Sequence, residues 1–196
     1  MARSILFVLA GLFFAATVKA ATYVETEADF AKHIELHRQR VAALGLALAA
    51  KEYPSVDQRT LRFFLLLHDS SKTKSTADLY RFYGKTGLTE QEIGDLKKTV
   101  QHINDVDSRM AEKFFRRFKI NAQEAEVFLW IEKVADLVDR SSDPVATEEF
   151  ARKMTPASEY MKDERSRSAA LFLEKRYNGI VSGFEMPSVR SCQRVF

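Results

Sequence analysis

The residues of this chain best suited to chemistry are a histidine and an aspartate that end an apolar run. The segment FFLLLHDSSK covers residues 63–72, and its five large apolar residues lead directly into His68 and Asp69. Burial of a polar group without a partner costs roughly 2–7 kcal/mol, and burial of an unpaired charge costs more. The pair therefore predicts partners, which are either a bound metal ion or hydrogen-bonding groups of the fold.

Two further segments place proton-binding and metal-binding side chains among apolar residues. His37 lies in the apolar stripe of its helix, and His33 lies at the edge of that stripe, where we interpret it as a flanking residue. The segment VADLVDR, residues 134–140, carries Asp136 and Asp139 in a helix that is apolar on nearly every side, so periodicity leaves open which of the two faces inward. Three helices then each direct an imidazole or a carboxylate to the interior, as in the metal sites of helical bundles.

The elements that must position these side chains are all predicted to be helices. Capping residues mark three helix starts: Thr26 with Asp29, Thr89 with Glu92, and Asn121 with Glu124. Apolar spacing predicts helices over residues 26–48, 57–68, 89–105, 121–138, 145–154 and 157–178. The sequence shows no alternating strand pattern and no internal repeat. The pattern predicts an all-α fold, with one helical domain over residues 27–178 and a loosely packed tail over 179–196.

The composition favours a single compact domain without a nucleic-acid surface. The chain has 196 residues, 46% hydrophobic and 29% charged, with only 7 Gly and 4 Pro, which suits one helical domain. The formal charge is +3, and Arg3 and Lys19 supply two of the positive charges, so residues 21–196 are nearly neutral. The basic segment FFRRFK, residues 114–119, is therefore interpreted as an amphipathic helix face packed on the core, and no nucleic-acid partner is expected.

Residues 1–20, MARSILFVLAGLFFAATVKA, have the pattern of a secretory signal peptide. Their apolar stretch from Ile5 to Val18 has 14 positions, fewer than the roughly 20 needed to span a bilayer. We expect export with cleavage near Ala20 and no membrane span after cleavage, with the periplasm and secretion to the medium as alternative destinations. An uncleaved anchor or an ordinary N-terminal helix is the alternative interpretation of this segment. Cys192 is the only cysteine, which excludes an internal disulfide.

Taken in order, these residues resemble the HD-domain metal-dependent phosphohydrolases. The segment HRQRVA, residues 37–42, looks like the family's first histidine with its following Val-Ala. LHDSSK, residues 67–72, looks like its His-Asp doublet, and VAD, residues 134–136, looks like the segment of its last aspartate. The resemblance covers residues 27–142, and it departs from the family at Ser71, where many members have glycine.

The resemblance implies a divalent metal site whose ligands are His37, His68, Asp69 and Asp136. It also implies that Asp69 serves as general base and that Lys72 meets a phosphate oxygen. Two imidazoles and two carboxylates suit Mn²⁺, Fe²⁺, Co²⁺, Ni²⁺ or Zn²⁺, and such an ion lowers the pKa of bound water toward about 7. His102 resembles the additional histidine of two-metal members and is the candidate second-metal ligand. The sequence leaves open whether Asp136 or Asp139 is the last ligand.

The implied function is enzymatic. We expect an exported hydrolase of phosphate monoesters or diesters, with nucleotides or related small phosphates as substrates. One alternative is a non-catalytic HD-like module of the cell envelope that binds a ligand or a partner. Another is an exported interaction protein in which the four ligand residues are coincidental. The walls of the substrate cleft are expected from residues 73–88 and the long C-terminal helix, while the oligomeric state is left open.

Overall fold

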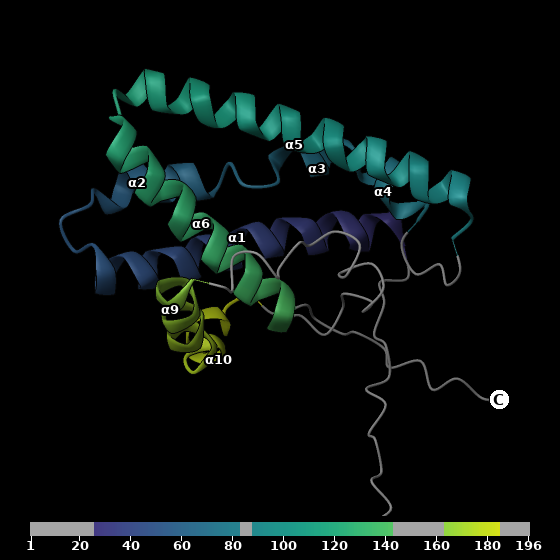
Figure 1. The fold of residues 1–196 in the computed structure, drawn as a ribbon. Helices are drawn as coiled ribbons and strands as arrows, with labels where there is room; N and C mark the ends of the chain where they lie inside the picture. The colour runs from purple at the N-terminus through teal and green to yellow at the C-terminus, as the bar shows by residue number, and fades with distance from the viewer. Residues whose placement is uncertain (1–25, 83–87, 143–162, 185–196) are drawn as a thin grey trace, which may run out of the picture.

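The computed structural model describes residues 26–82, 88–142 and 163–184, and these residues form helices and no strand (Figure 1). The helices are α1 (Glu27–Glu52), α2 (Gln58–Leu65), α3 (Ser70–Lys74), α4 (Thr76–Tyr80), α5 (Glu90–Phe118), α6 (Ala122–Ser142), α9 (Glu164–Glu174) and α10 (Tyr177–Val181). The predicted all-α class is therefore confirmed. The expected signal peptide and the helix expected over 145–154 lie outside the described residues.

Helix starts follow the capping residues found in the sequence. The caps at Thr26, Asp57 and Thr89 each accept a hydrogen bond from a backbone N–H of the first turn, and Thr89 forms a full capping box with Glu92. Asn121 Oδ1 accepts a 2.9 Å bond from the backbone N–H of Glu124. Such caps satisfy N–H groups that have no partner inside the helix, so they fix a helix start locally.

Helix ends differ more from expectation. Helix α5 continues to Phe118, well beyond the expected end near Asp105, because Phe114 keeps its buried face in the core and Lys119 supplies the left-handed C-cap. Helix α2 stops at Leu65, so His68 and Asp69 lie in the turn that follows it. Helix α10 runs beyond the expected boundary at residue 178, because Val181 is 4% exposed and packs in the core.

The apolar interior consists of two clusters along α1. The larger cluster joins α1 to α2, α5, α6, α9 and α10, and its most buried large side chains are Leu44, Leu48, Leu61, Leu65, Phe128, Ile131 and Leu173. The smaller cluster comprises Phe30, Ile34, Leu79, Phe82, Leu96 and Ile103. On α1, the residue Ile34 ends the small cluster and Val41 begins the large one. The buried polar residues His37 and Arg40 lie between them.

The long helices are arranged around α1. Figure 1 shows α5 and α6 as a hairpin, with α6 returning to cross α1, and with α9 and α10 on the side of α1 and α6 away from α5. Phe114 and Phe115 of α5 pack in or against the large cluster, as the amphipathic interpretation of FFRRFK requires. Among the described residues, no helix is long and apolar enough to cross a membrane.

Candidate metal centre

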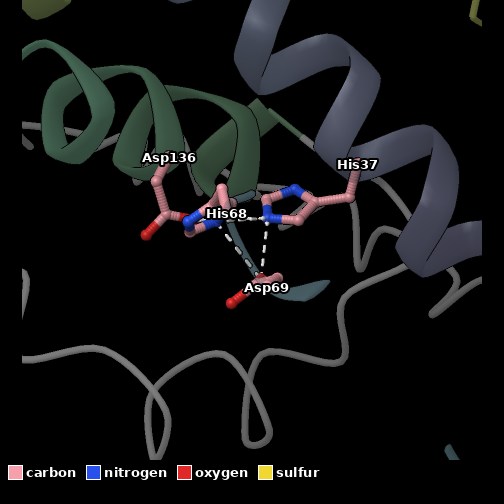
Figure 2. A group of neighbouring side chains, drawn as sticks. All are labelled: His37, His68, Asp69 and Asp136. Carbon is pink, nitrogen blue, oxygen red and sulfur yellow. Dashed lines mark hydrogen bonds and ion pairs between the residues drawn. The ribbon is translucent and has the colours of Figure 1, made fainter. Parts of the chain in front are cut away.

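Four side chains from three parts of the chain converge at the junction of the two apolar clusters. His37 comes from α1, His68 and Asp69 come from the turn after α2, and Asp136 comes from α6. Figure 2 shows these four side chains pointing toward one another. One ligand atom from each residue lies within 4.8 Å of the others, and three of the four residues are buried.

The spacings fit a single ion. The Nε2 atoms of His37 and His68 are 3.3 Å apart, and each lies 3.2 or 3.3 Å from Asp69 Oδ2 and Asp136 Oδ1. Tetrahedral ligands about 2.0–2.2 Å from a common ion are about 3.3–3.6 Å apart. The two nitrogens and Asp136 Oδ1 therefore form a triangle whose centre is about 2 Å from each atom. A mixed nitrogen and oxygen donor set of this kind suits a first-row divalent ion.

A carboxylate behind each histidine fixes which ring nitrogen faces the site. His37 Nδ1 donates to Asp139 Oδ2 at 2.7 Å, and His68 Nδ1 donates to Glu132 Oε1 at 2.6 Å. With the proton on Nδ1, each Nε2 directs its lone pair at the common point, which is the usual arrangement for metal-ligating histidines. This geometry assigns Asp136 to the ligand group and Asp139 to the support of His37, which the sequence had left open.

Asp139 is a fully buried ion-pair partner. It is 0% exposed, and Arg40 donates from Nε to its Oδ1 at 2.8 Å and from Nη2 to its Oδ2 at 3.0 Å. Burial alone would raise the pKa of Asp139, but the bonds from His37 and Arg40 outweigh burial and lower the pKa to about 2. Asp139 therefore stays ionised and keeps its acceptor atoms available to the histidine.

The turn that carries the His-Asp doublet is held by α1. Arg38 Nε donates to the backbone oxygen of His68 at 2.9 Å, and a second guanidinium N–H bonds the oxygen of Leu66. Both carbonyls belong to the turn after α2, where the helix no longer supplies N–H partners. Asp69 adopts a left-handed backbone with φ 53°, a conformation that aspartate tolerates better than most residues. The reversal brings the Asp69 carboxylate beside the His68 ring.

The electrostatics of the group favour positive charge between its carboxylates. That charge is carried either by two protonated imidazoles or by a metal ion. Burial lowers the pKa of His37, but the hydrogen bonds that His37 donates to Asp136 and Asp139 more than compensate and raise it to about 9. The pKa of His68 is likewise raised despite burial, chiefly by the charges of Asp69 and Asp136. Burial opposes ionisation of these two aspartates, yet neighbouring cations hold their pKa values well below the usual range. A metal ion would displace the imidazole protons, since it binds only neutral histidine.

A pocket of about 280 Å³ opens beside the ligand group. It is lined by Phe64, Leu67, His68, Asp69, Asn104, Asp107, Ser108, Ala111, Leu129, Glu132, Lys133, Asp136 and Arg140. In the described chain its walls come mainly from α5 and α6, rather than from residues 73–88 and the C-terminal helix as expected. The reason is that α5 is longer than predicted and runs past the doublet toward α6. Arg140 Nε donates to Asp136 Oδ1 at 2.7 Å within this pocket.

The structure brings together His37, His68, Asp69 and Asp136, and it places Lys72 beside them. The ammonium of Lys72 bonds Asp69 Oδ2. His102 is exposed on α5 and belongs neither to the ligand group nor to the pocket lining. It points to solvent because Ile103, the next residue, occupies the buried face of α5. The described geometry therefore offers no support for His102 as a second-metal ligand.

Sequence reasoning missed the supporting residues Glu132, Arg38 and Arg40. A signal for Glu132 was present, because Glu132, Asp136 and Asp139 are spaced by four and three residues and so share one face of a largely apolar helix. The two arginines showed no such signal, since a cation beside a histidine on an amphipathic helix usually faces solvent.

Comparisons with protein-family models, with curated proteins and with solved structures found no match to this chain. The helical architecture and the buried His-Asp group are compatible with an HD-like fold. They establish that the described part of the chain is all-α and that it brings together four side chains that could hold a metal ion.

Proposed function

We propose that this protein is an exported, metal-dependent phosphohydrolase of the HD type that acts on small phosphate esters, such as nucleotides. The observation that supports the proposal most is the convergence of His37, His68, Asp69 and Asp136, with both Nδ1 atoms held by carboxylates. A buried polar layer of this kind is costly unless its members are paired or share a cation. A metal role accounts for all four side chains together.

The ligand set would hold Mn²⁺, Fe²⁺, Co²⁺, Ni²⁺ or Zn²⁺, with His37 and His68 as nitrogen donors and Asp69 and Asp136 as oxygen donors. When bound, such an ion acidifies a coordinated water and offsets charge on a phosphoryl oxygen. The pocket lies on the side of His68, Asp69 and Asp136. A phosphate ester would therefore approach the site from between α5 and α6.

The chain's own groups supply the remaining chemistry. Asp69 is 5% exposed, and its neighbours hold its pKa low despite the opposing effect of burial. At neutral pH its carboxylate is therefore ionised and would orient an attacking water by accepting a hydrogen bond from it. Lys72 bonds Asp69, and Arg140 bonds Asp136 and lines the pocket. In this proposal, both cations would stabilise the charge of a phosphoryl group during transfer.

Metal content tests the site. Residues 21–196 would be purified as wild type and as a His68→Ala, Asp69→Ala double variant, and analysed for transition metals. We expect about one equivalent in the wild type and almost none in the variant. His102→Ala is the matched control, because it removes an exposed histidine outside the group, and it should retain the metal. A wild type that stays metal-free after incubation with Mn²⁺, Ni²⁺ and Zn²⁺ would remove the proposal.

Hydrolysis tests the enzyme. The metal-loaded wild type would be screened against phosphate monoesters and diesters, with the double variant as background. Release of phosphate or of the alcohol by the wild type alone supports the hydrolase. Metal binding without turnover of any ester would favour the non-catalytic HD-like module instead. Export is tested separately, by the mass of the protein recovered from outside the cytoplasm, which should lack residues 1–20.

A further inference from the structure

The last described helix reaches the metal centre through a single hydroxyl group. Tyr177 is the first residue of α10, and its hydroxyl donates a 2.6 Å hydrogen bond to Asp139 Oδ1. The other oxygen of Asp139 accepts the 2.7 Å bond from His37 Nδ1. Two consecutive hydrogen bonds thus connect α10 to one of the four convergent side chains, although 38 residues separate Tyr177 from Asp139.

The hydroxyl completes the environment of a carboxylate that has no access to solvent. Arg40 donates to both oxygens of Asp139 and supplies the compensating charge. Tyr177 adds a neutral donor at Oδ1, so each oxygen accepts two bonds. Rotation of the carboxylate about its Cβ–Cγ bond would weaken several of these bonds at once, because in a buried network each bond constrains the others.

We infer that Tyr177 is a positioning residue of the metal centre. By holding the plane of the Asp139 carboxylate, it keeps the acceptor oxygen aligned with His37 Nδ1 and so keeps His37 Nε2 directed at the other ligand atoms. The inference rests on the proposed metal site and adds a new component to it. Helix α10, which lies beyond the region of family resemblance, would then contribute to metal affinity as well as to the core.

The size of the effect follows from the number of bonds between the hydroxyl and the metal ligand. Removal of a group that directly holds a ligating histidine changes metal affinity by about 10–100-fold. Tyr177 lies one hydrogen bond farther from His37 than Asp139 does, and Arg40 still bonds Asp139 when the hydroxyl is removed. We therefore expect the Tyr177→Phe variant to bind metal about tenfold more weakly than the wild type.

Calorimetric titration with Zn²⁺ or Mn²⁺ alone measures this loss. Tyr177→Phe keeps the ring that packs against the large apolar cluster and removes only the donor. Tyr53→Phe is the matched control, since the Tyr53 ring packs against the same cluster, edge-on to Trp130 at 6.0 Å and beneath Arg165, both of which lie outside the ligand group. The dissociation constant should rise about tenfold in Tyr177→Phe and stay unchanged in Tyr53→Phe.

Two further readouts separate positioning from a structural role. In Tyr177→Phe the NMR signal of the His37 Nδ1 proton should move and exchange faster with water, which a change confined to core packing would not cause. In an Asp139→Asn background, Tyr177→Phe should add little further loss of metal affinity, because the two residues act in series. Additive losses would mean that Tyr177 acts by another route and would overturn the inference.

The outcomes distinguish this inference from the proposed function. An unchanged dissociation constant in Tyr177→Phe, beside lost binding in the His68→Ala, Asp69→Ala variant, overturns the inference and leaves the metal site intact. A lowered unfolding temperature without a change in metal affinity has the same meaning. A tenfold loss of metal affinity in Tyr177→Phe, together with a wild type that hydrolyses no phosphate ester, supports the inference and contradicts the proposed hydrolase activity. A wild type that binds no metal overturns both.

Discussion

At the scale of single residues, the behaviour of the site depends on the carboxylates that stand behind the two histidines. Asp139 accepts a hydrogen bond from Nδ1 of His37, and Glu132 accepts one from Nδ1 of His68. Both carboxylates lie on the side of the ring away from the convergent Nε2 atoms. This fixes the tautomer and makes each Nε2 a stronger electron donor. The ligands alone therefore do not define the site, and the residues behind them should matter for metal affinity.

Glu132→Gln should weaken metal binding by about 10–100-fold. The amide keeps the size of the side chain and an oxygen acceptor but loses the negative charge that raises the basicity of His68. Competition with a coloured chelator measures the change in affinity. Glu126→Gln, an exposed change on the same helix, is the control and should have no effect. Equal affinities of Glu132→Gln and wild type would show that the 2.6 Å contact does not tune the site.

The pKa values of His37 and Asp139 predict how the stability of the metal-free protein depends on pH. The pKa of His37 rises from 6.5 to about 9 on folding, so its stabilising contribution is complete below pH 6.5 and is lost as the pH rises through 9. The pKa of Asp139 falls from 3.8 to about 2, so its contribution is complete above pH 4 and is lost on acidification through 2. Urea unfolding at a series of pH values should show greatest stability between about pH 4 and 6.5.

Alkaline titration gives the sharper half of this test. Between pH 6.5 and 9, the free energy of unfolding of the metal-free protein should fall by roughly 3 kcal/mol from the titration of His37 alone. With saturating metal the decline should shrink, because the ion then occupies the place of the imidazole proton, and metal affinity itself should increase with pH. A metal-free protein whose free energy of unfolding is constant from pH 6.5 to 9 would contradict the assigned protonation of His37.

At the scale of elements, the sequence predicts well those features that are determined by residues close together along the chain. The starts at Thr26, Thr89 and Asn121 were correct because a cap is made by residues three positions apart. The end of α5 was wrong because it depends on Phe114 finding partners in the core, including the ring of Phe64 at 5.6 Å. Such partners lie far along the chain and leave no local pattern.

The same distinction explains the site. His68 and Asp69 were found because a polar pair after five apolar residues is a local anomaly. The supporting contacts of Arg40 and Tyr177 with Asp139 span 99 and 38 residues. They depend on how α1, α6 and α10 pack, and no spacing along the sequence encodes them. The candidate ligands were therefore predictable, and the network that orients them was not.

Close packing of α1 against α2 and α6 depends on Gly45. A Cβ atom at this position would lie 2.7 Å from Leu65 Cδ1 and 3.2 Å from Ile131 Cγ2, and both of these side chains are 0% exposed. Gly45→Ala should therefore lower the free energy of unfolding by about 1–3 kcal/mol, although alanine is the better helix former. Urea denaturation measures the change.

Gly94→Ala is the control for helix propensity. Gly94 lies in α5, and a Cβ there would meet no atom within 4 Å. Alanine should raise the free energy of unfolding by about 0.5–1 kcal/mol. Opposite signs at the two glycines would demonstrate the packing requirement at Gly45, whereas stabilisation by both changes would contradict the close approach of α1 and α2.

At the scale of the whole molecule, a bound ion would act as a cross-link between distant parts of the chain. His37, His68 and Asp136 are separated by 31 and 68 residues and come from α1, the turn after α2, and α6. Unfolding separates these elements and destroys the site, so metal binds the native state far more tightly than the unfolded chain. Metal binding and folding are then coupled, and removal of the metal by a chelator should lower the free energy of unfolding.

This coupling predicts that added metal raises the unfolding temperature. At a free metal concentration about 100 times the dissociation constant, the native state gains about 2.7 kcal/mol, which in a domain of this size is roughly 5–10 °C. The His68→Ala, Asp69→Ala variant should show no shift on metal addition, and His102→Ala should shift like the wild type. Scanning calorimetry with and without chelator measures all three proteins. Equal shifts in the wild type and the double variant would place the ion elsewhere, because a site that includes His68 and Asp69 loses its metal when both residues are replaced.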